Sequence, residues 1–231
     1  MTLPSTLVLL SGGLDSTVLA ASLLDEGHPV EAVSIHYGQR HKKELHAAAA
    51  VADAFGVRHD VVDLGVLRQH LTGSALTDDV DVPDGHYAEA SMRATVVPNR
   101  NAIMLSVAVG VAVARGHAQV ATAVHAGDHF IYPDCRPYFI TAMDQAALVG
   151  TEGFGDVRVV APFVGISKAD IASLGNRLGA PVGLSWSCYK GGDIHCGRCG
   201  TCVERSEAHR IAGVPDPTVY ADPDFAATVT A

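Results

Sequence analysis

The 231-residue sequence is poor in basic residues, and this limits its partners. It has 16 Lys and Arg against 25 Asp and Glu, which gives a formal net charge of −9 at pH 7. Proteins that grip a nucleic-acid backbone usually present a basic face. We therefore expect a small-molecule substrate and no nucleic-acid partner, and we interpret the one basic cluster, at residues 40–43, as the solvated start of a helix.

Long apolar runs and targeting signals are also missing. The longest apolar stretches are interrupted by Gly, Ser, His or Arg within the length of a helix, so we expect no membrane-spanning segment and no membrane partner. The N-terminus has no basic flank of the kind that marks a signal peptide. With 48% hydrophobic and 18% charged residues, the composition is typical of an ordered globular protein, and we expect it to be cytoplasmic.

The most informative motif is Ser-Gly-Gly-Leu-Asp-Ser at residues 11–16. It follows an apolar run at residues 7–10 and precedes residues 17–24, whose spacing predicts a helix. A strand-turn-helix corner holds anions, because free backbone N–H groups and the helix dipole both attract them. The glycines permit close approach of the backbone to a phosphate, the serines offer hydroxyl donors, and Asp15 suits Mg²⁺.

This loop lacks the features of two other nucleotide-binding motifs. No lysine occurs before Lys42, so the loop is not a Walker loop, and its spacing is not G-x-G-x-x-G. The pattern instead resembles the pyrophosphate loop of the N-type ATP pyrophosphatases, which cleave ATP between the α- and β-phosphates.

The rest of the chain alternates predicted strands and helices. Further strands are predicted at residues 30–36, 57–64, 120–124 and 157–161, and helices at residues 42–55, 102–115 and 202–211. This order predicts an α/β fold with a doubly wound, mostly parallel, Rossmann-like sheet. We expect residues 1–180 to form the ATP-binding domain, with a mobile insertion at residues 65–97, and residues 181–231 to form a small zinc-binding region.

Only five cysteines are present, and four of them cluster near the C-terminus: Cys188, Cys196, Cys199 and Cys202. Two consecutive C-x₂-C steps after an upstream thiol match a tetrahedral S₄ zinc site, and a cytoplasmic chain keeps such thiols out of disulfides. The alternative is an iron–sulfur cluster, but the ferredoxin continuation C-x₃-C-P is missing. Four thiolates leave no open position, so the zinc is expected to be structural, with His195 a bystander. Cys135 is expected to be a buried thiol without a covalent role.

These motifs together resemble the 7-cyano-7-deazaguanine synthase family. In order they are residues 11–16, His-Tyr-Gly-Gln-Arg-His at 36–41, Val-Pro-Asn-Arg-Asn at 97–101, His-Ala-Gly-Asp at 125–128, residues 132–136 and the four cysteines. The resemblance implies a fold of the adenine nucleotide alpha hydrolase type and a homodimer. It also implies ATP-dependent conversion of 7-carboxy-7-deazaguanine and ammonia into the nitrile. The expected route runs through an adenylated carboxylate and an amide, with release of AMP and pyrophosphate.

The motifs and the resemblance together assign roles to individual residues. Nucleotide, phosphates and metal are assigned to Leu10, Ser11, Gly12, Gly13, Leu14, Asp15, Ser16, Thr17, His36, Tyr37 and Gln39. Catalysis is assigned to Asp15, Ser16, Arg100 and Lys168, and substrate recognition to Arg100, Asn101, Asp128 and Asp134. A glutamine-hydrolysing site needs a nucleophilic cysteine at the N-terminus or in a Gly-flanked elbow. The chain has neither, so ammonia is expected to come free or from another protein.

Two other functions stay open at this point. A tRNA-modifying enzyme of the same loop superfamily would use the cysteines for an iron–sulfur cluster, and would need a basic face. A non-catalytic nucleotide-binding zinc module would bind ATP without turnover. Such a module tends to lose its metal carboxylate, whereas this chain retains Asp15.

Overall fold

The fold is built on a parallel sheet of five strands. The computed structural model describes residues 3–87 and 90–229. The strands are β1 (Thr6–Leu9), β2 (Val30–His36), β3 (His59–Asp63), β4 (Gln119–Ala121) and β5 (Arg158–Val160). Their order in the sheet is β3-β2-β1-β4-β5, and every pairing is parallel. The sequence order therefore reverses direction between β1 and β4, which confirms the predicted doubly wound α/β sheet.

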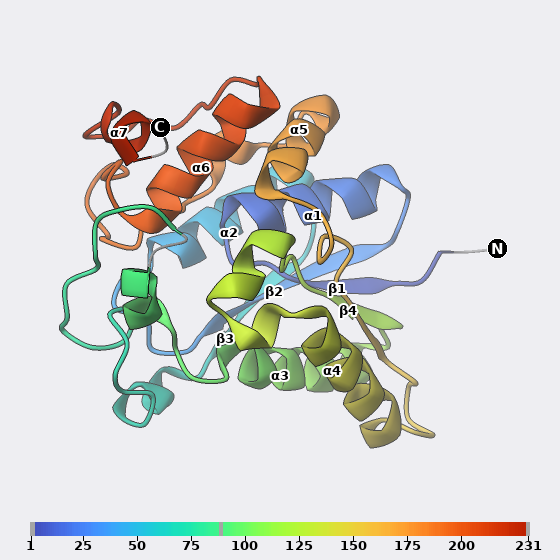
Figure 1. Ribbon diagram of the computed structural model, residues 1–231. Helices are drawn as coiled ribbons and strands as arrows, with labels where there is room; N and C mark the ends of the chain where they lie inside the picture. Colours follow the sequence, from blue (N-terminus) through green and yellow to red (C-terminus); the bar gives the residue numbers. More distant parts are fainter. Residues whose placement is uncertain (1–2, 88–89, 230–231) are drawn as a thin grey trace.

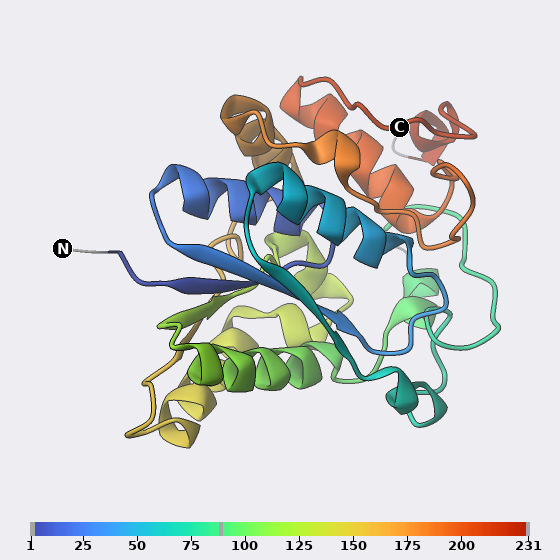
Figure 2. The same cartoon turned by 180° about the vertical axis from the view of Figure 1, so that it is seen from behind.

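Helices cover both faces of this sheet. One face carries α1 (Leu14–Asp25), α2 (Lys43–Phe55), α5 (Lys168–Leu178) and α6 (Gly200–Ala212), and the other carries α3 (Arg100–Arg115) and α4 (Pro137–Gly150), as Figures 1 and 2 show from opposite sides. The short α7 (Phe225–Val229) lies beside α6. Strand β1 alternates between the two layers: Leu7 and Leu9 pack in the core under α3, whereas Val8 packs against α1.

Most predicted elements are confirmed, with bounds that differ by a few residues. The predicted strand at residues 120–124 ends at Ala121, because the chain then leaves the sheet toward the carboxyl edge. The sequence does not predict α4, which begins with Pro137 at its first position. That placement suits proline, since its missing N–H would have no partner in the first helical turn.

Residues 65–97 contain little regular structure, in agreement with their lack of periodicity. Their described part includes the 3-10 helices Gly65–Gln69 and Ala90–Thr95. The segment nevertheless buries Leu76, Tyr87 and Met92 in the core below α3. The mobility of residues 65–97 stays a prediction. The domain boundary near residue 180 also stays a prediction, and α5 packs directly along α6 across it.

The segment Ser91–Arg115 is long and apolar enough, by length and composition, to cross a membrane. In the fold it is interrupted, because Pro98 and Asn99 form a turn before α3 begins. The 16 residues of α3 rise only about 24 Å at 1.5 Å per residue, less than the ~30 Å hydrocarbon core of a bilayer. Since Leu105 and Ala108 are buried against the sheet, α3 is placed as a core helix.

Asn99 starts α3 in a left-handed backbone conformation, with φ of 54°. Glycine and asparagine reach this region at little cost, whereas other residues strain. We expect Asn99→Ala to lower the free energy of unfolding by about 1 kcal/mol, and Asn99→Gly to leave it almost unchanged. Urea denaturation measures both. An equal loss in the two variants would show that the side chain, not the backbone, matters here.

Candidate active site

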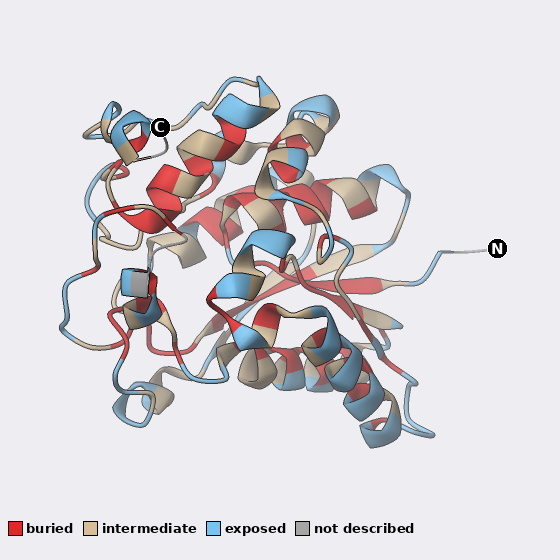
Figure 3. Cartoon of the chain, viewed as in Figure 1, coloured by how far each residue is buried: buried red, intermediate tan, exposed pale blue. Residues whose placement is uncertain are grey.

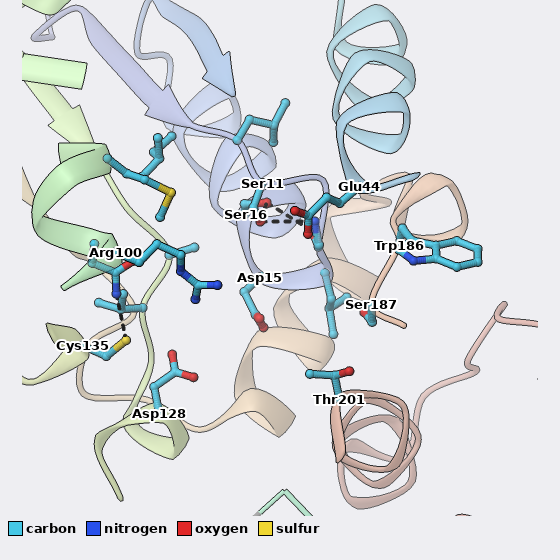
Figure 4. Close-up of a pocket in the computed structure, with 18 of the residues that line it drawn as sticks. Ser11, Asp15, Ser16, Glu44, Arg100, Asp128, Cys135, Trp186, Ser187 and Thr201 are labelled. Atoms are coloured by element: carbon cyan, nitrogen blue, oxygen red, sulfur yellow. Dashed lines mark hydrogen bonds between the residues drawn. The ribbon is translucent and has the colours of Figure 1, made fainter. Parts of the chain in front are cut away.

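A cavity opens at the carboxyl ends of β1 and β4, where the strand order reverses (Figure 4). Doubly wound sheets place their ligands at this point. The cavity is lined by the loop after β1, the start of α3, the start of α5, the segment after β4, and residues 186–189 before α6. The predicted residues that line it are Leu10, Ser11, Gly13, Leu14, Asp15, Ser16, Tyr37, Arg100, Asn101, Asp128 and Lys168.

The loop after β1 folds as a compact turn into α1. The hydroxyls of Ser11 and Ser16 lie 3.0 Å apart, and the Ser11 hydroxyl accepts from the Gly13 N–H at 3.3 Å. The hydroxyl of Thr17 points inward and donates to the Gly13 carbonyl at 2.8 Å. The loop is thus held by its own hydroxyls at the positive end of α1, where anions are stabilised.

The position of Gly12 in the motif suggests close approach to a phosphate, but the structure shows close packing against α2. Its φ is +82°, and an added Cβ would lie 2.0 Å from the carbonyl oxygen of Glu44 at the start of α2. Glycine at this position therefore permits close packing of the loop against α2.

Asp15, Lys168 and Glu204 form a buried charged group on one side of the cavity. The Lys168 ammonium lies 3.1 Å from Asp15 Oδ2 and 2.7 Å from Glu204 Oε2. Burial alone would raise the pKa of Asp15, but the charges of Lys168 and His125 hold it below its ordinary value. Burial likewise opposes the charge of Lys168, yet Asp15 and Glu204 raise its pKa above the ordinary value. Asp15 is therefore ionised and Lys168 is charged.

The second carboxylate oxygen of Asp15 is available to a ligand. Asp15 Oδ1 is buried, and no hydrogen-bond partner for it exists in residues 3–87 and 90–229. A buried carboxylate oxygen without a partner is costly unless a ligand completes it. Hard cations such as Mg²⁺ prefer this donor, so the residues present fit the expected metal.

His125 and Asp128 lie next to this charged group. His125 Nε2 lies 3.7 Å from Asp128 Oδ1 and 3.9 Å from both Asp15 Oδ2 and Glu204 Oε1. Asp128 accepts from the Tyr87 hydroxyl at 3.1 Å and from the backbone N–H of His125 at 3.1 Å. These bonds fix the Asp128 carboxylate toward the cavity, where Figure 4 shows it beside Arg100 and Asp15.

Arg100 points into the cavity from the first position of α3 (Figure 4). Its guanidinium donates to the Tyr37 hydroxyl at 3.3 Å and lies 5.5 Å from the centre of that ring. Burial would lower its pKa, but the hydroxyls of Tyr37, Tyr189 and Tyr132 raise it well above the ordinary value. No carboxylate in the described part of the chain pairs with it within 4 Å. A buried cation without a carboxylate partner at this distance can bind an anionic ligand.

Five predicted site residues do not line the cavity: Gly12, Thr17, His36, Gln39 and Asp134. Gln39 lines a smaller adjoining hollow instead. His36 Nδ1 pairs with Asp63 Oδ1 at 2.8 Å, beyond the end of β2. Asp134 accepts from the Asn101 N–H at 2.9 Å, and so caps the first turn of α3. Their predicted roles therefore require action through neighbouring residues.

The four clustered cysteines converge as the spacing predicts. Their sulfur atoms all lie within 4.8 Å of one another, and Cys196 Sγ is 3.9 Å from Cys202 Sγ. A tetrahedral zinc ion with Zn–S bonds of about 2.3 Å separates its sulfurs by about 3.8 Å, so the group can hold a metal ion of this kind. Hydrogen bonding with the thiols of Cys188, Cys199 and Cys202 holds the pKa of Cys196 well below its usual range.

Comparison with known proteins gives the family. Residues 5–213 match the family model for queuosine biosynthesis protein QueC. The chain belongs to the QueC family. It is 59% identical over 225 residues to 7-cyano-7-deazaguanine synthase of Rhizobium rhizogenes, covering 97% of this chain and 95% of the relative. The corresponding protein of Rhizobium meliloti is 60% identical over 220 residues, or 95% of this chain and 93% of the relative.

A solved structure supports the fold assignment of this QueC-family chain. The NMN synthetase from Francisella tularensis aligns with 97% of the chain and 84% of its own length, with a TM-score of 0.51. At 15% identity, this similarity shows the fold alone. The family range, residues 5–213, includes the cavity and all four clustered cysteines.

Several site residues of this QueC-family protein are not predicted by its sequence: Glu44, Tyr87, Tyr132, Trp186 and Tyr189, which line the cavity, and Glu204, which contacts Lys168. Glu44 stands in the first turn of α2, where an acid is ordinarily explained by the helix dipole. Glu204 follows Cys202 by two residues, and only its distance to Lys168 reveals a role. A signal was available for Tyr132, which opens one of the motifs.

Proposed function

We propose that this QueC-family protein is an ATP-dependent ligase that converts 7-carboxy-7-deazaguanine and ammonia into 7-cyano-7-deazaguanine, with release of AMP and pyrophosphate. The observation that carries the proposal is one cavity with a phosphate loop on one side and Arg100, without a carboxylate partner, on the other. One wall suits a nucleotide and the other suits the substrate carboxylate. The names of the relatives agree with this pairing.

The chemistry explains why one adenylating site serves two steps. A carboxylate is a poor acyl donor because hydroxide is a poor leaving group. Adenylation of the carboxylate makes AMP the leaving group instead. Attack by ammonia gives the amide, and a second activation at the amide oxygen permits dehydration to the nitrile. Ser11, Ser16 and the start of α1 would hold the phosphates, while Lys168 stabilises the charge of the departing pyrophosphate. Mg²⁺, when bound at Asp15, would neutralise phosphate charge.

The substrate is assigned to the opposite wall. Arg100 would bind the carboxylate of the deazapurine through charge-assisted hydrogen bonds. Asp128, which is oriented by Tyr87 and His125, would accept from the N–H groups of the guanine-like edge. Asp134 would act by holding Asn101, since its own carboxylate is already engaged.

We further propose one structural zinc ion per chain, held by the four clustered cysteines, in a cytoplasmic homodimer that does not bind nucleic acid. The homodimer is supported by exposed apolar side chains on and after α4, an outward face that Figure 3 colours largely as exposed. They are Tyr138, Val149 and Phe154, each more than 70% exposed. Exposed apolar patches mark interaction surfaces.

Mass spectrometry tests the proposed reaction directly. The protein is incubated with ATP, Mg²⁺, ammonium and 7-carboxy-7-deazaguanine, and we expect the nitrile together with two AMP and two pyrophosphate for each product. Accumulation of the amide alone would contradict the dehydration step. Absence of AMP would contradict the whole proposal. A colourless protein that contains zinc would separate it from an iron–sulfur tRNA-modifying enzyme, which absorbs visible light.

A further inference from the structure

A second, much smaller hollow adjoins the active-site cavity. The two share Tyr37, Glu44, Trp186, Cys188 and Tyr189 as lining residues. The hollow has a volume of about 30 Å³, which is room for one or two molecules the size of water. It is too small for a nucleotide or a deazapurine, so it suits a reactant as small as ammonia.

The lining of this hollow suits a small cation. Tyr37, Trp186 and Tyr189 line the hollow together with the carboxylate residue Glu44, and Gln39, His41, Leu76 and Cys188 complete the lining. Aromatic faces attract cations electrostatically. The Trp186 ring already does so, because the Lys43 ammonium lies 4.8 Å from its centre. In the view of Figure 4, Glu44 lies between the phosphate loop and Trp186.

Glu44 is held in place through one of its two carboxylate oxygens. Gln39 Nε2 donates to Glu44 Oε1 at 2.9 Å, and Gln39 Oε1 accepts from the Tyr37 N–H at 2.9 Å. Within the described residues no hydrogen bond to Oε2 is formed, so that oxygen can accept from a ligand. The side chain thus has a fixed orientation and a vacant acceptor.

The surroundings of Glu44 also keep its proton affinity high. Burial raises its pKa to about 7, against the opposing charge of Arg100 and the hydrogen bond from Gln39. The other titratable groups that line the hollow are Tyr37, His41, Cys188 and Tyr189. Burial raises the pKa values of Tyr37 and Tyr189 and lowers that of His41. A carboxylate of this kind can take and return a proton near neutral pH.

We propose that Glu44 binds an ammonium ion at this hollow and accepts one of its protons to make the nucleophile. This rests on the proposed function. Ammonium has no lone pair, so an N–H bond must break first, with the proton passing to Glu44 Oε2. The lone pair of ammonia then forms the C–N bond to the carbonyl carbon of the acyl adenylate. The C–O bond to AMP breaks and its electron pair leaves on AMP. The nitrogen loses a second proton to water, and Glu44 returns its own proton to solvent.

Glu44→Gln tests the proposal with little change in shape, because the new amide oxygen can still accept from Gln39. We expect kcat/KM for ammonium to fall on the order of 10²-fold, the usual size of a general-base effect. In the wild type, kcat/KM for total ammonium should level off above about pH 7, where Glu44 is ionised. In the variant it should keep rising about tenfold per pH unit, because only free ammonia then reacts.

Hydroxylamine separates proton transfer from a structural role. It is uncharged at about pH 8 and needs no prior deprotonation, so Glu44→Gln should form hydroxamate at close to the wild-type rate. An equal loss with hydroxylamine and ammonium would overturn the proposal. Asp53→Asn, an exposed carboxylate-to-amide change on the same helix, is the matched control and should alter neither rate.

Exchange of labelled pyrophosphate into ATP distinguishes this proposal from the function on which it rests. The exchange requires the substrate 7-carboxy-7-deazaguanine but no ammonia. Its absence in the wild type would overturn the proposed function. Normal exchange in both proteins, with identical ammonium dependence and pH profiles, would overturn only the assignment of Glu44.

Discussion

Asp15→Asn is expected to lower pyrophosphate exchange on the order of 10³-fold, the upper range for removing one electrostatic contact in a reaction site. The amide lacks the negative charge that would hold Mg²⁺. It also weakens the electrostatic contact that helps to position the Lys168 ammonium. The fold should persist, because Lys168 keeps its 2.7 Å contact with Glu204. Exchange kinetics at saturating ATP measure the effect, and circular dichroism checks folding.

Asp25→Asn is the matched control for this variant. Asp25 is the last residue of the same helix and is exposed to solvent, so its change should leave exchange unaffected. If Asp15→Asn retained most of the exchange activity, the assignment of the loop as the metal and phosphate site would be contradicted.

Cys202→Ser is expected to give the largest loss of stability, about 4 kcal/mol or more, because loss of a metal is one of the few changes of that size. Cys199 is the N-cap of α6 and Cys202 lies in its first turn. Without the ion, the start of α6 and the segment that carries Cys188 lose their common anchor. Metal analysis together with thermal unfolding measures the effect, which chelation of the wild type should reproduce.

Cys135→Ala controls for the loss of a buried thiol. Cys135 is buried but lies apart from the cluster, in the 3-10 helix that precedes α4. The Cys135→Ala variant should therefore retain one metal ion per chain. If Cys202→Ser kept both its metal and its unfolding temperature, the four thiols would not form a structural metal site.

The features predicted from the sequence are those encoded by neighbouring residues. The strand, the glycines and Asp15 of the loop after β1 lie within about ten positions, and three of the four clustered cysteines, Cys196, Cys199 and Cys202, lie within seven. Each motif carries its own spacing, so it can be recognised before the chain folds. The burial of β1 on both faces follows equally from the continuous apolar run at residues 7–10.

The features that the sequence does not predict depend on distant segments meeting. Tyr37, Tyr132 and Tyr189 surround Arg100 from three separate loops, and no spacing rule connects them. In the sequence Glu204 is one of several acids near the clustered cysteines. Only the packing of α6 against α5 places it beside Lys168. Glu44 resembles any acid in a first helical turn until the adjoining hollow is seen.

The contact between Glu204 and Lys168 has a consequence for a cell short of metal. Glu204 belongs to the helix whose first turn carries Cys202, and Lys168 faces the phosphate loop through Asp15. In the proposed mechanism, a chain that fails to acquire its ion would lose the orientation of Lys168, which we assign to the departing pyrophosphate. We expect such a chain neither to form product nor to cleave ATP. A shortage of metal would therefore reduce the number of active molecules without causing ATP cleavage that yields no product.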